Sequence, residues 1–282
     1  MKITTKSLYL NYQKKSARYS INQYLYNSQM LKAFSSSLSA DYPEDVECKV
    51  TLVKFLRARK WDLPKAEEMY RKKMTWVQQR QPHLIRQEDV QSSIDTGKAF
   101  WHGTDPNKRP ILVVRAGNHF AASGPDGVEQ DLKFVFYIME LGMSMLPPPP
   151  NNQIVVLYDR ANFSRKNFDT SMVKNFSCLG DYYPETIHSV HIIRANWLFS
   201  TLRAIAAKIL DPVFMSKLQV WNMTDEEMRK EMTEKVASKE NLLKDHGGIS
   251  TGEDPKVPYH PTSLPKQFLT IINGDDSGVK HE

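Results

Sequence analysis

Ile154-Val155-Val156-Leu157-Tyr158 is an unbroken apolar run in a chain of 282 residues, and it decides the fold class. A strand covered on both faces has this composition, because neither face needs polar side chains. Working outward from it, we predict three more strands of similar texture, at Ile111 to Arg115, Val190 to Arg194 and Leu218 to Trp221. Covered strands of this kind are typical of a mainly parallel sheet.

Helical patterns separate these strands. The predicted helices run from Val128 to Leu146, Asp169 to Leu179 and Leu198 to Leu210, and the first stops where consecutive prolines begin. Strands that alternate with helices predict an α/β domain with a mainly parallel sheet covered by helices. We place this domain at residues 86–250 and treat residues 251–282 as a C-terminal extension.

A smaller, all-helical lobe is predicted before this domain, at residues 41–85. Four apolar residues recur at steps of four, three and three, which predicts one buried stripe: Val46, Val50, Val53 and Leu56. Asp62 is the predicted N-cap of a second helix. The buried side of that helix is predicted to carry Ala66, Met69, Tyr70, Trp76 and Val77.

The excess of basic residues lies at the start of the chain. Residues 1–40 contain six Lys and Arg and no Asp or Glu, and removing these six from the 38 basic residues leaves 32, equal to the 32 acidic residues. The rest of the chain therefore lacks the positive charge typical of nucleic-acid-binding proteins. We expect a flexible leader over residues 1–40, with adhesion to an anionic membrane or a mitochondrial targeting role as alternatives.

Membrane spans and disulfides are not indicated. No apolar run approaches the ~20 residues that a spanning helix requires. Cys48 and Cys178 stand far apart, with no CxxC motif or Cys/His cluster around either. We therefore expect a soluble protein of the reducing cytoplasm that binds membranes only peripherally.

Catalytic motifs are also absent, since the sequence contains no GxSxG elbow, no GxxxxGK[ST] loop and no GxGxxG after a strand. Glu185, His188 and His191 have metal-ligand spacing, but strand alternation should point them to different faces, so no metal is expected. Asp159 ends the decisive strand, where α/β sheets place functional carboxylates, and we expect it to cap the following turn. A hydrolase using Asp159 with one of these histidines is the alternative.

Three stretches of the chain, taken together, resemble the Sec14-like (CRAL-TRIO) family. The first is VKFLRARKWD at residues 53–62, similar to the family's FLRARKFD helix end. The second comprises DYYPE at 181–185, IIRANWLFS at 192–200 and the segment from Leu210 to Lys217 that contains LDPV and SK. The third is the glycine pair at 247–248. Matched in order, they cover about Val50 to Gly248.

This resemblance implies a lipid-binding and lipid-transfer protein that is not an enzyme and needs no cofactor besides the bound lipid. The family's α/β domain encloses an apolar cavity of lipid size. A gating helix, equivalent here to Lys208 to Trp221, would open at a membrane and exchange one lipid. The expected partners are a phospholipid, a membrane surface and lipid kinases, and the expected state is a monomer.

The resemblance also implies a phosphatidylinositol site. Members that bind this lipid hold its head group through the Arg of FLRAR, the Glu of YYPE, and the Lys and Thr of the DPVT-SK segment. Here these residues are Arg59, Glu185 and Lys217, with Phe214 in place of the Thr. The residue types suit the task, because a phosphodiester needs cationic donors and inositol hydroxyls need an acceptor.

One departure from the family argues against a second ligand. Members that also carry phosphatidylcholine bind its phosphate through Ser, Thr and two Tyr, and our alignment puts Ile154, Val156, Leu112 and Ile138 at those places. Apolar side chains leave a buried phosphate without partners, so phosphatidylcholine is not an expected ligand. We expect these four residues and Phe214 to line the apolar part of the pocket. A carrier of a sterol, tocopherol or retinoid is the alternative.

Overall fold

The computed structural model of the chain describes residues 26–39, 41, 49–120, 124–169, 179–195 and 212–250. Two compact units make up the chain, residues 1–75 and residues 76–282, and each is described by itself. The predicted helices at 169–179 and 198–210 fall in the gaps of this description, apart from the end residues Asp169 and Leu179.

The first unit is helical. Residues 26–38 form its first helix, α2 spans Lys49–Ala58, and α3 spans Leu63–Arg80, so that the boundary after Thr75 falls within α3. Its core consists of apolar side chains that are at most 4% exposed: Phe34, Leu38, Leu52, Phe55, Leu56, Ala66, Met69 and Tyr70. The ring of Tyr70 meets those of Phe34 and Phe55 edge-on, with centroids 5.9 and 5.1 Å apart.

The predicted leader is too long. Residues 26–38 are helical, and Phe34 and Leu38 in this helix are fully buried in the core of the first unit. A flexible leader over all of residues 1–40 is therefore wrong for this segment. The physical reason is the apolar content of the segment, since burying a Phe and a Leu side chain contributes about 1.5–3 kcal/mol each.

The predicted stripe on α2 is only partly right, because Leu56 is fully buried but Val50 is exposed, and Val46 lies outside the described residues; the start of α3 is confirmed. Val50 is 39% exposed, while Leu52 and Phe55 are fully buried. The helix is oriented so that the larger side chains of Leu52 and Phe55 are buried in place of Val50, because the free energy of burial grows with apolar area. The backbone N–H of Lys65 donates to Oδ1 of Asp62 at 3.2 Å, which is the predicted N-cap hydrogen bond.

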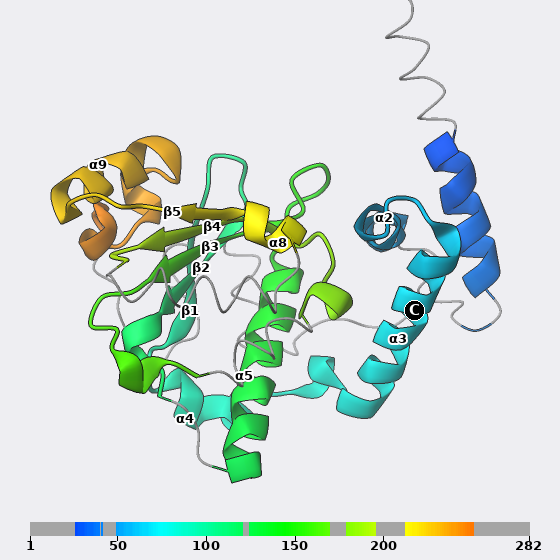
Figure 1. The fold of residues 1–282 in the computed structure, drawn as a ribbon, viewed down its shortest axis with the longest axis horizontal. Helices are drawn as coiled ribbons and strands as arrows, with labels where there is room; N and C mark the ends of the chain where they lie inside the picture. The colour runs from blue at the N-terminus through cyan, green and yellow to red at the C-terminus, as the bar shows by residue number, and fades with distance from the viewer. Residues whose placement is uncertain are drawn as a thin grey trace, which may run out of the picture. The chain divides into compact units, whose positions relative to one another are not determined.

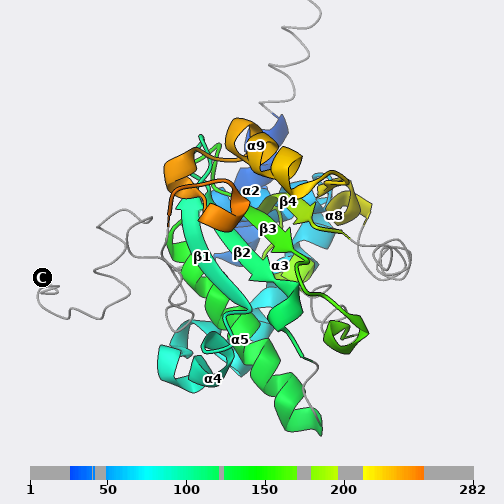
Figure 2. The ribbon, with the colours of Figure 1, turned by 90° about the vertical axis from the view of Figure 1, so that its left-hand side faces the viewer.

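The second unit contains a five-stranded sheet in the order β1-β2-β3-β4-β5 (Figures 1 and 2). The strands are β1 Ala99–Thr104, β2 Pro110–Arg115, β3 Ile154–Asp159, β4 Ile187–Ile193 and β5 Leu218–Val220. The pair β1–β2 is antiparallel and the other pairs are parallel, so the predicted α/β class with a mainly parallel sheet is confirmed. Strand β1 was not predicted, because His102 and Gly103 interrupt its apolar pattern.

Helices pack on both faces of this sheet (Figure 1). The described helices of the unit are α4 Gln91–Ile94, α5 Gly124–Ser144, α8 Pro212–Ser216 and α9 Asp225–Lys235. The described short 3-10 turns are η2 Pro82–Leu84, η3 Gln87–Val90, η4 Ala116–Asn118, η5 Arg165–Asn167, η6 Lys239–Asn241 and η7 Lys244–His246. Because side chains alternate along a strand, one set packs against α5 and the other against α9. We call these surfaces the α5 face and the α9 face.

Helix α9 was not predicted, although its start carries a sequence signal. Thr224 is its N-cap, its hydroxyl accepts from the backbone N–H of Glu227 at 3.3 Å, and the Glu227 carboxylate accepts from the Thr224 N–H at 2.9 Å. This reciprocal pair is a capping box, and the pattern Thr-x-x-Glu is visible in the sequence.

A close contact joins β1 to α5. The indole N–H of Trp101 donates to the backbone carbonyl of Ile138 at 3.1 Å, and a Cβ on Gly142 would lie only 2.2 Å from the Trp101 ring. Trp101 is fully buried. The glycine is thus required by the ring that packs against the helix, which fixes α5 on this face of the sheet.

Candidate functional site

The α5 face carries two rows of side chains that run across neighbouring strands. The first row, aligned by the strand register, is Leu112, Val156, Val190 and Leu218. The second row is Val114, Tyr158, Ile192 and Val220. The first row consists of aliphatic residues alone, so this part of the face offers no hydrogen bond from its side chains.

The five predicted pocket-lining residues lie in one hydrophobic cluster on this face. Leu112, Ile154 and Val156 come from the sheet, and Ile138 comes from α5. These four side chains are 1–8% exposed, and Phe214 of α8 packs against them while partly buried. The structure therefore brings the five residues together, and their contact with a lipid stays a prediction.

Tyr158 is the polar exception in the two rows. Burial raises the pKa of its phenol above the ordinary value, so the hydroxyl is neutral and can donate a hydrogen bond. In the sequence this residue is part of an apolar run, and we did not predict it as a polar group of the site. A sequence signal was available, because Tyr158 follows four aliphatic residues and is the one residue of the run that carries a hydroxyl.

Glu185 and Lys217 lie at the same end of the sheet, because they precede the neighbouring parallel strands β4 and β5. The Lys217 carbonyl accepts from the N–H of Val190 at 3.0 Å, which fixes its backbone, and its side chain is half-buried. Glu185 has a left-handed backbone with φ of 53°, and its carbonyl accepts from Nε2 of Gln153 at 3.1 Å. Both predicted head-group residues are thus held by their main chains.

Arg59 belongs to the other unit of the chain. It follows the last residue of α2, its backbone N–H donates to the Phe55 carbonyl at 3.1 Å, and its side chain is half-buried. The structure places Arg59 in the first unit and Glu185 and Lys217 in the second. A site that combines the three residues stays a prediction.

Asp159 serves the fold. One of its oxygens accepts from the N–H of Ala161 at 2.8 Å, which confirms the predicted capping of the next turn. The other oxygen lies 2.6 Å from Nη1 of Arg194 and 3.0 Å from Nε2 of His246. Burial opposes its charge, but the hydrogen bonds from His246 and Ala161 and the charge of Arg194 together lower the pKa of Asp159.

His188 and His191 lie on the same face, against expectation. The strand register shifts between Ile154 and Val155, which pair with Ile187 and Ser189, so His188 is an extra residue in a β-bulge. Both histidines consequently line a cavity of about 230 Å³ together with Ser189, and Oγ of Ser189 lies 3.0 Å from Nε2 of His191. Burial lowers the pKa of His191 to about 4.

The hydrolase alternative gains no support from this geometry. Its carboxylate, Asp159, is hydrogen-bonded to His246 instead of His188 or His191. Within the described part of the chain, the pair of Ser189 and His191 lacks an orienting acid, since Nδ1 of His191 is buried there without a hydrogen-bond partner. A nucleophile activated by an oriented base is therefore not assembled from these residues.

Comparisons with known proteins agree with this arrangement. The family model of the CRAL/TRIO domain matches residues 94–248, and that of the CRAL/TRIO N-terminal domain matches residues 27–72. A CRAL-TRIO domain-containing protein of Schizosaccharomyces pombe, C3H8.02, is 30% identical over 76% of this chain and 48% of its own length. The phosphatidylinositol transfer protein CSR1 of Eremothecium gossypii is 29% identical over 71% of this chain and 47% of its own length.

The chain therefore spans about half the length of the curated relatives it matches. The crystal structure of Sfh5 superimposes with a TM-score of 0.67 and 14% identity, covering 88% of this chain and 96% of Sfh5. At that identity the likeness concerns the fold alone. In the part of the chain that the structure describes, no helix has both the length and the apolar character needed to cross a membrane.

Proposed function

The chain belongs to the CRAL/TRIO domain family, and we propose that it carries phosphatidylinositol between membranes. Lipid binding and lipid transfer are the functions that the names of its relatives indicate for this family. The observation that supports this proposal most is the all-aliphatic first row on the α5 face, Leu112, Val156, Val190 and Leu218. This row ends at β5, directly after Lys217.

Acyl chains impose a strict requirement on such a face. A lipid that leaves a bilayer exchanges one apolar environment for another, and each methylene exposed to water would cost about 0.8 kcal/mol. The carrier must therefore offer an equally apolar surface along the chains. The first row, with Ile138 and Ile154 in the same cluster, meets that requirement.

The head group needs the opposite chemistry. Lys217 and Arg59 supply cations for the phosphodiester, and the Glu185 carboxylate accepts hydrogen bonds from inositol hydroxyls. The fixed backbones of Lys217 and Glu185 reduce the entropy lost when a head group binds. In our proposal these three residues hold the lipid at its polar end.

Phosphatidylcholine is excluded in this proposal by apolar residues of the same hydrophobic cluster. Leu112, Ile138, Ile154 and Val156 lie together in the cluster and carry no hydrogen-bonding side-chain group. A phosphate buried among them would lose its water without gaining partners, which costs several kcal/mol at least. Specificity thus comes from the cost of the wrong ligand as well as from contacts with the right one.

The gate in this proposal is the segment from Lys208 to Trp221, of which residues 208–211 lie outside the described part of the chain. Its described part contains α8 and β5, and β5 is a three-residue strand at the edge of the sheet. Few hydrogen bonds hold so short an edge strand, and Val213 beside it is 50% exposed. Contact with a membrane would release this segment from the sheet and open the lipid site. In our proposal the protein acts as a monomer and delivers its lipid to lipid kinases.

Vesicle transfer tests the proposal. Phosphatidylinositol and phosphatidylcholine are labelled in separate donor vesicles, and their movement to acceptor vesicles is followed with wild type and with the double variant Arg59→Ala, Lys217→Ala. We expect transfer of phosphatidylinositol alone, and a loss of at least ~10-fold in the double variant, because charged hydrogen bonds contribute about 1.5–3 kcal/mol each.

The matched control is Arg57→Ala, Lys230→Ala, which removes the same two charge types from exposed positions of α2 and α9. It should transfer phosphatidylinositol like wild type. Normal transfer by the Arg59, Lys217 variant would refute the head-group site, and efficient phosphatidylcholine transfer by wild type would refute the exclusion argument.

A second function is favoured by one observation. Phe214 stands where family members with an inositol site carry Thr, and it packs against the apolar cluster on the α5 face. A rigid apolar body, such as a sterol, tocopherol or retinoid, would suit this arrangement without a charged head group. Mass spectrometry of the lipid that co-purifies with the chain separates the two functions, because a ligand without phosphorus supports this one and phosphatidylinositol supports the first.

A further inference from the structure

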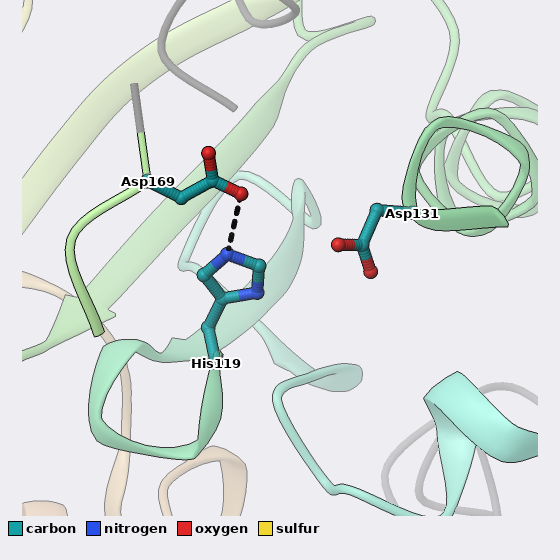
Figure 3. Close-up of side chains that lie close together, drawn as sticks. All are labelled: His119, Asp131 and Asp169. Carbon is teal, nitrogen blue, oxygen red and sulfur yellow. Dashed lines mark hydrogen bonds and ion pairs between the residues drawn. The ribbon is translucent and has the colours of Figure 1, made fainter. Parts of the chain in front are cut away.

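Three titratable side chains that belong neither to the rows of the α5 face nor to the proposed head-group site lie close together (Figure 3). His119 follows η4 at the end of β2, Asp169 follows η5 after β3, and Asp131 lies on α5. Nε2 of His119 is 3.2 Å from Oδ2 of Asp169. One ligand atom from each of the three residues lies within 4.8 Å of the others. The cluster thus joins three segments that are distant in sequence.

Burial makes the cluster unusual. The side chains of His119, Asp131 and Asp169 are 13%, 9% and 7% exposed. Oδ1 of Asp131 forms an ion pair with Nζ of Lys98, but Oδ2 is buried and has no hydrogen-bond partner among the residues that the structure describes. In Figure 3 the Asp131 carboxylate points toward His119. Burying a carboxylate oxygen without a partner costs free energy, and a bound cation would offset that cost.

We propose that His119, Asp131 and Asp169 bind a divalent transition-metal ion, and that Zn²⁺ fits best. One imidazole nitrogen and two carboxylate oxygens are zinc ligands, whereas Ca²⁺ and Mg²⁺ prefer oxygen ligands throughout. Zinc bonds to these atoms measure about 2.0–2.2 Å, which separates two tetrahedral ligands by about 3.3 Å. The distance between His119 Nε2 and Asp169 Oδ2 already has about that value, and the ligand atom of Asp131, which lies within 4.8 Å of both, has to move closer to bind the same ion.

The surroundings hold the ligands in place. Nδ2 of Asn167 donates to the backbone carbonyls of Gly117 and His119 at 3.0 and 2.9 Å, which fixes the loop that carries the imidazole. A Cβ on Gly117 would lie 2.3 Å from the Ala161 carbonyl oxygen, so this loop packs tightly against the segment after β3. Lys98 orients Asp131 and leaves Oδ2 free to coordinate. Such outer contacts are what orient ligands in metal sites.

The place in the fold is also suitable. The carboxyl ends of β2 and β3, where His119 and Asp169 follow, are the edge at which open α/β sheets bind ligands. A metal ion there would tie the ends of two parallel strands to α5. This inference concerns no residue of the proposed lipid site, so the two proposals succeed or fail independently.

Zinc binding to the full chain without a histidine tag tests the inference. The protein is treated with a chelator, and uptake of Zn²⁺ is measured by native mass spectrometry and titration calorimetry, with Mg²⁺ as the competing hard cation. We expect one zinc ion per chain and no displacement by excess Mg²⁺. Wild-type protein that takes up no zinc would overturn the proposal whether or not any variant folds.

Variants identify the ligands. His119→Ala and Asp131→Asn should each weaken zinc binding by at least ~10-fold, as loss of a ligand does. His83→Ala, which removes an exposed histidine from η2, should bind zinc like wild type. Equal affinity in wild type and His119→Ala would reject the site.

An imidazolium ion offers the alternative explanation of the cluster. One outcome of nuclear magnetic resonance is that both ring nitrogens of His119 are protonated at neutral pH in chelator-treated protein, with neither proton displaced by zinc. In that case the imidazolium, and not a metal ion, balances the two carboxylates, and the metal proposal fails. A neutral imidazole whose resonances shift with one equivalent of zinc supports the proposal.

Discussion

The two faces of the sheet are made by the same strands and differ in their chemistry. The α5 face carries aliphatic rows with the single phenol of Tyr158, whereas the α9 face also carries Ser189 and His191 beside a polar cavity. Asp105 and Arg109 also line that cavity, and they form an ion pair in which Nη1 of Arg109 lies 3.0 Å from Oδ2 of Asp105. In our interpretation the α5 face is built to receive an apolar ligand, and the α9 face is built to hold the fold.

The largest expected effect comes from removing the contact that anchors α5. Trp101→Ala should lower the free energy of unfolding by about 3–5 kcal/mol, because it leaves a cavity and strips the Ile138 carbonyl of its donor. Urea denaturation measures this value. Phe120→Ala, at a position that is 63% exposed, is the control and should change it by less than about 0.5 kcal/mol. A loss below 1 kcal/mol at Trp101 would show that α5 is held elsewhere.

The next effect concerns pH and the α9 face. His191 has a pKa of about 4 in the fold against 6.5 ordinarily, so the unfolded chain binds a proton that the folded chain rejects between these values. Stability from this residue is full above pH 6.5 and is lost as pH falls toward 4, by roughly 3 kcal/mol at most. Comparing wild type with His191→Asn from pH 7 to pH 4 isolates this loss. Parallel pH curves for the two proteins would contradict it.

The smallest effect separates the faces by function. Val156→Thr and Val155→Thr each bury a hydroxyl, on the α5 and α9 faces respectively, and each should cost about 1–3 kcal/mol of stability. The proposed lipid contacts make only the first change costly for transfer, so phosphatidylinositol transfer should fall about fivefold or more in Val156→Thr and stay normal in Val155→Thr. Equal transfer by both variants would place the lipid away from the α5 face.

Local patterns predicted much of the second unit. Continuous apolar runs predicted β2, β3 and β4 within a few residues, and the apolar side of α5 predicted that helix. The run in β3 also indicated the α/β class, because this composition is typical of a strand covered on both faces. Patterns failed where tertiary contacts override them, as in β1, where His102 is buried although its side chain is polar.

The candidate site shows the same division. The family resemblance identified the residues, and the structure brings Leu112, Ile138, Ile154, Val156 and Phe214 into one cluster, whose contact with a lipid stays a prediction. Strand alternation gave the wrong face for His188, because a bulge changes the alternation and depends on the pairing of β4 with β3. The meeting of His119 with Asp131 and Asp169 had no sequence signal, since neither spacing nor periodicity links them.

By itself, the sequence determined the α/β class, the core strands, the family and the apolar character of the surface proposed for a lipid. These features depend on which side-chain types follow one another at short spacing, and this information is contained in the local sequence. Only the tertiary structure decided strand register, the bulge at His188, the packing of residues 26–38, and the cluster of His119, Asp131 and Asp169. These depend on which distant segments come together, and that follows from the free energy of the whole fold.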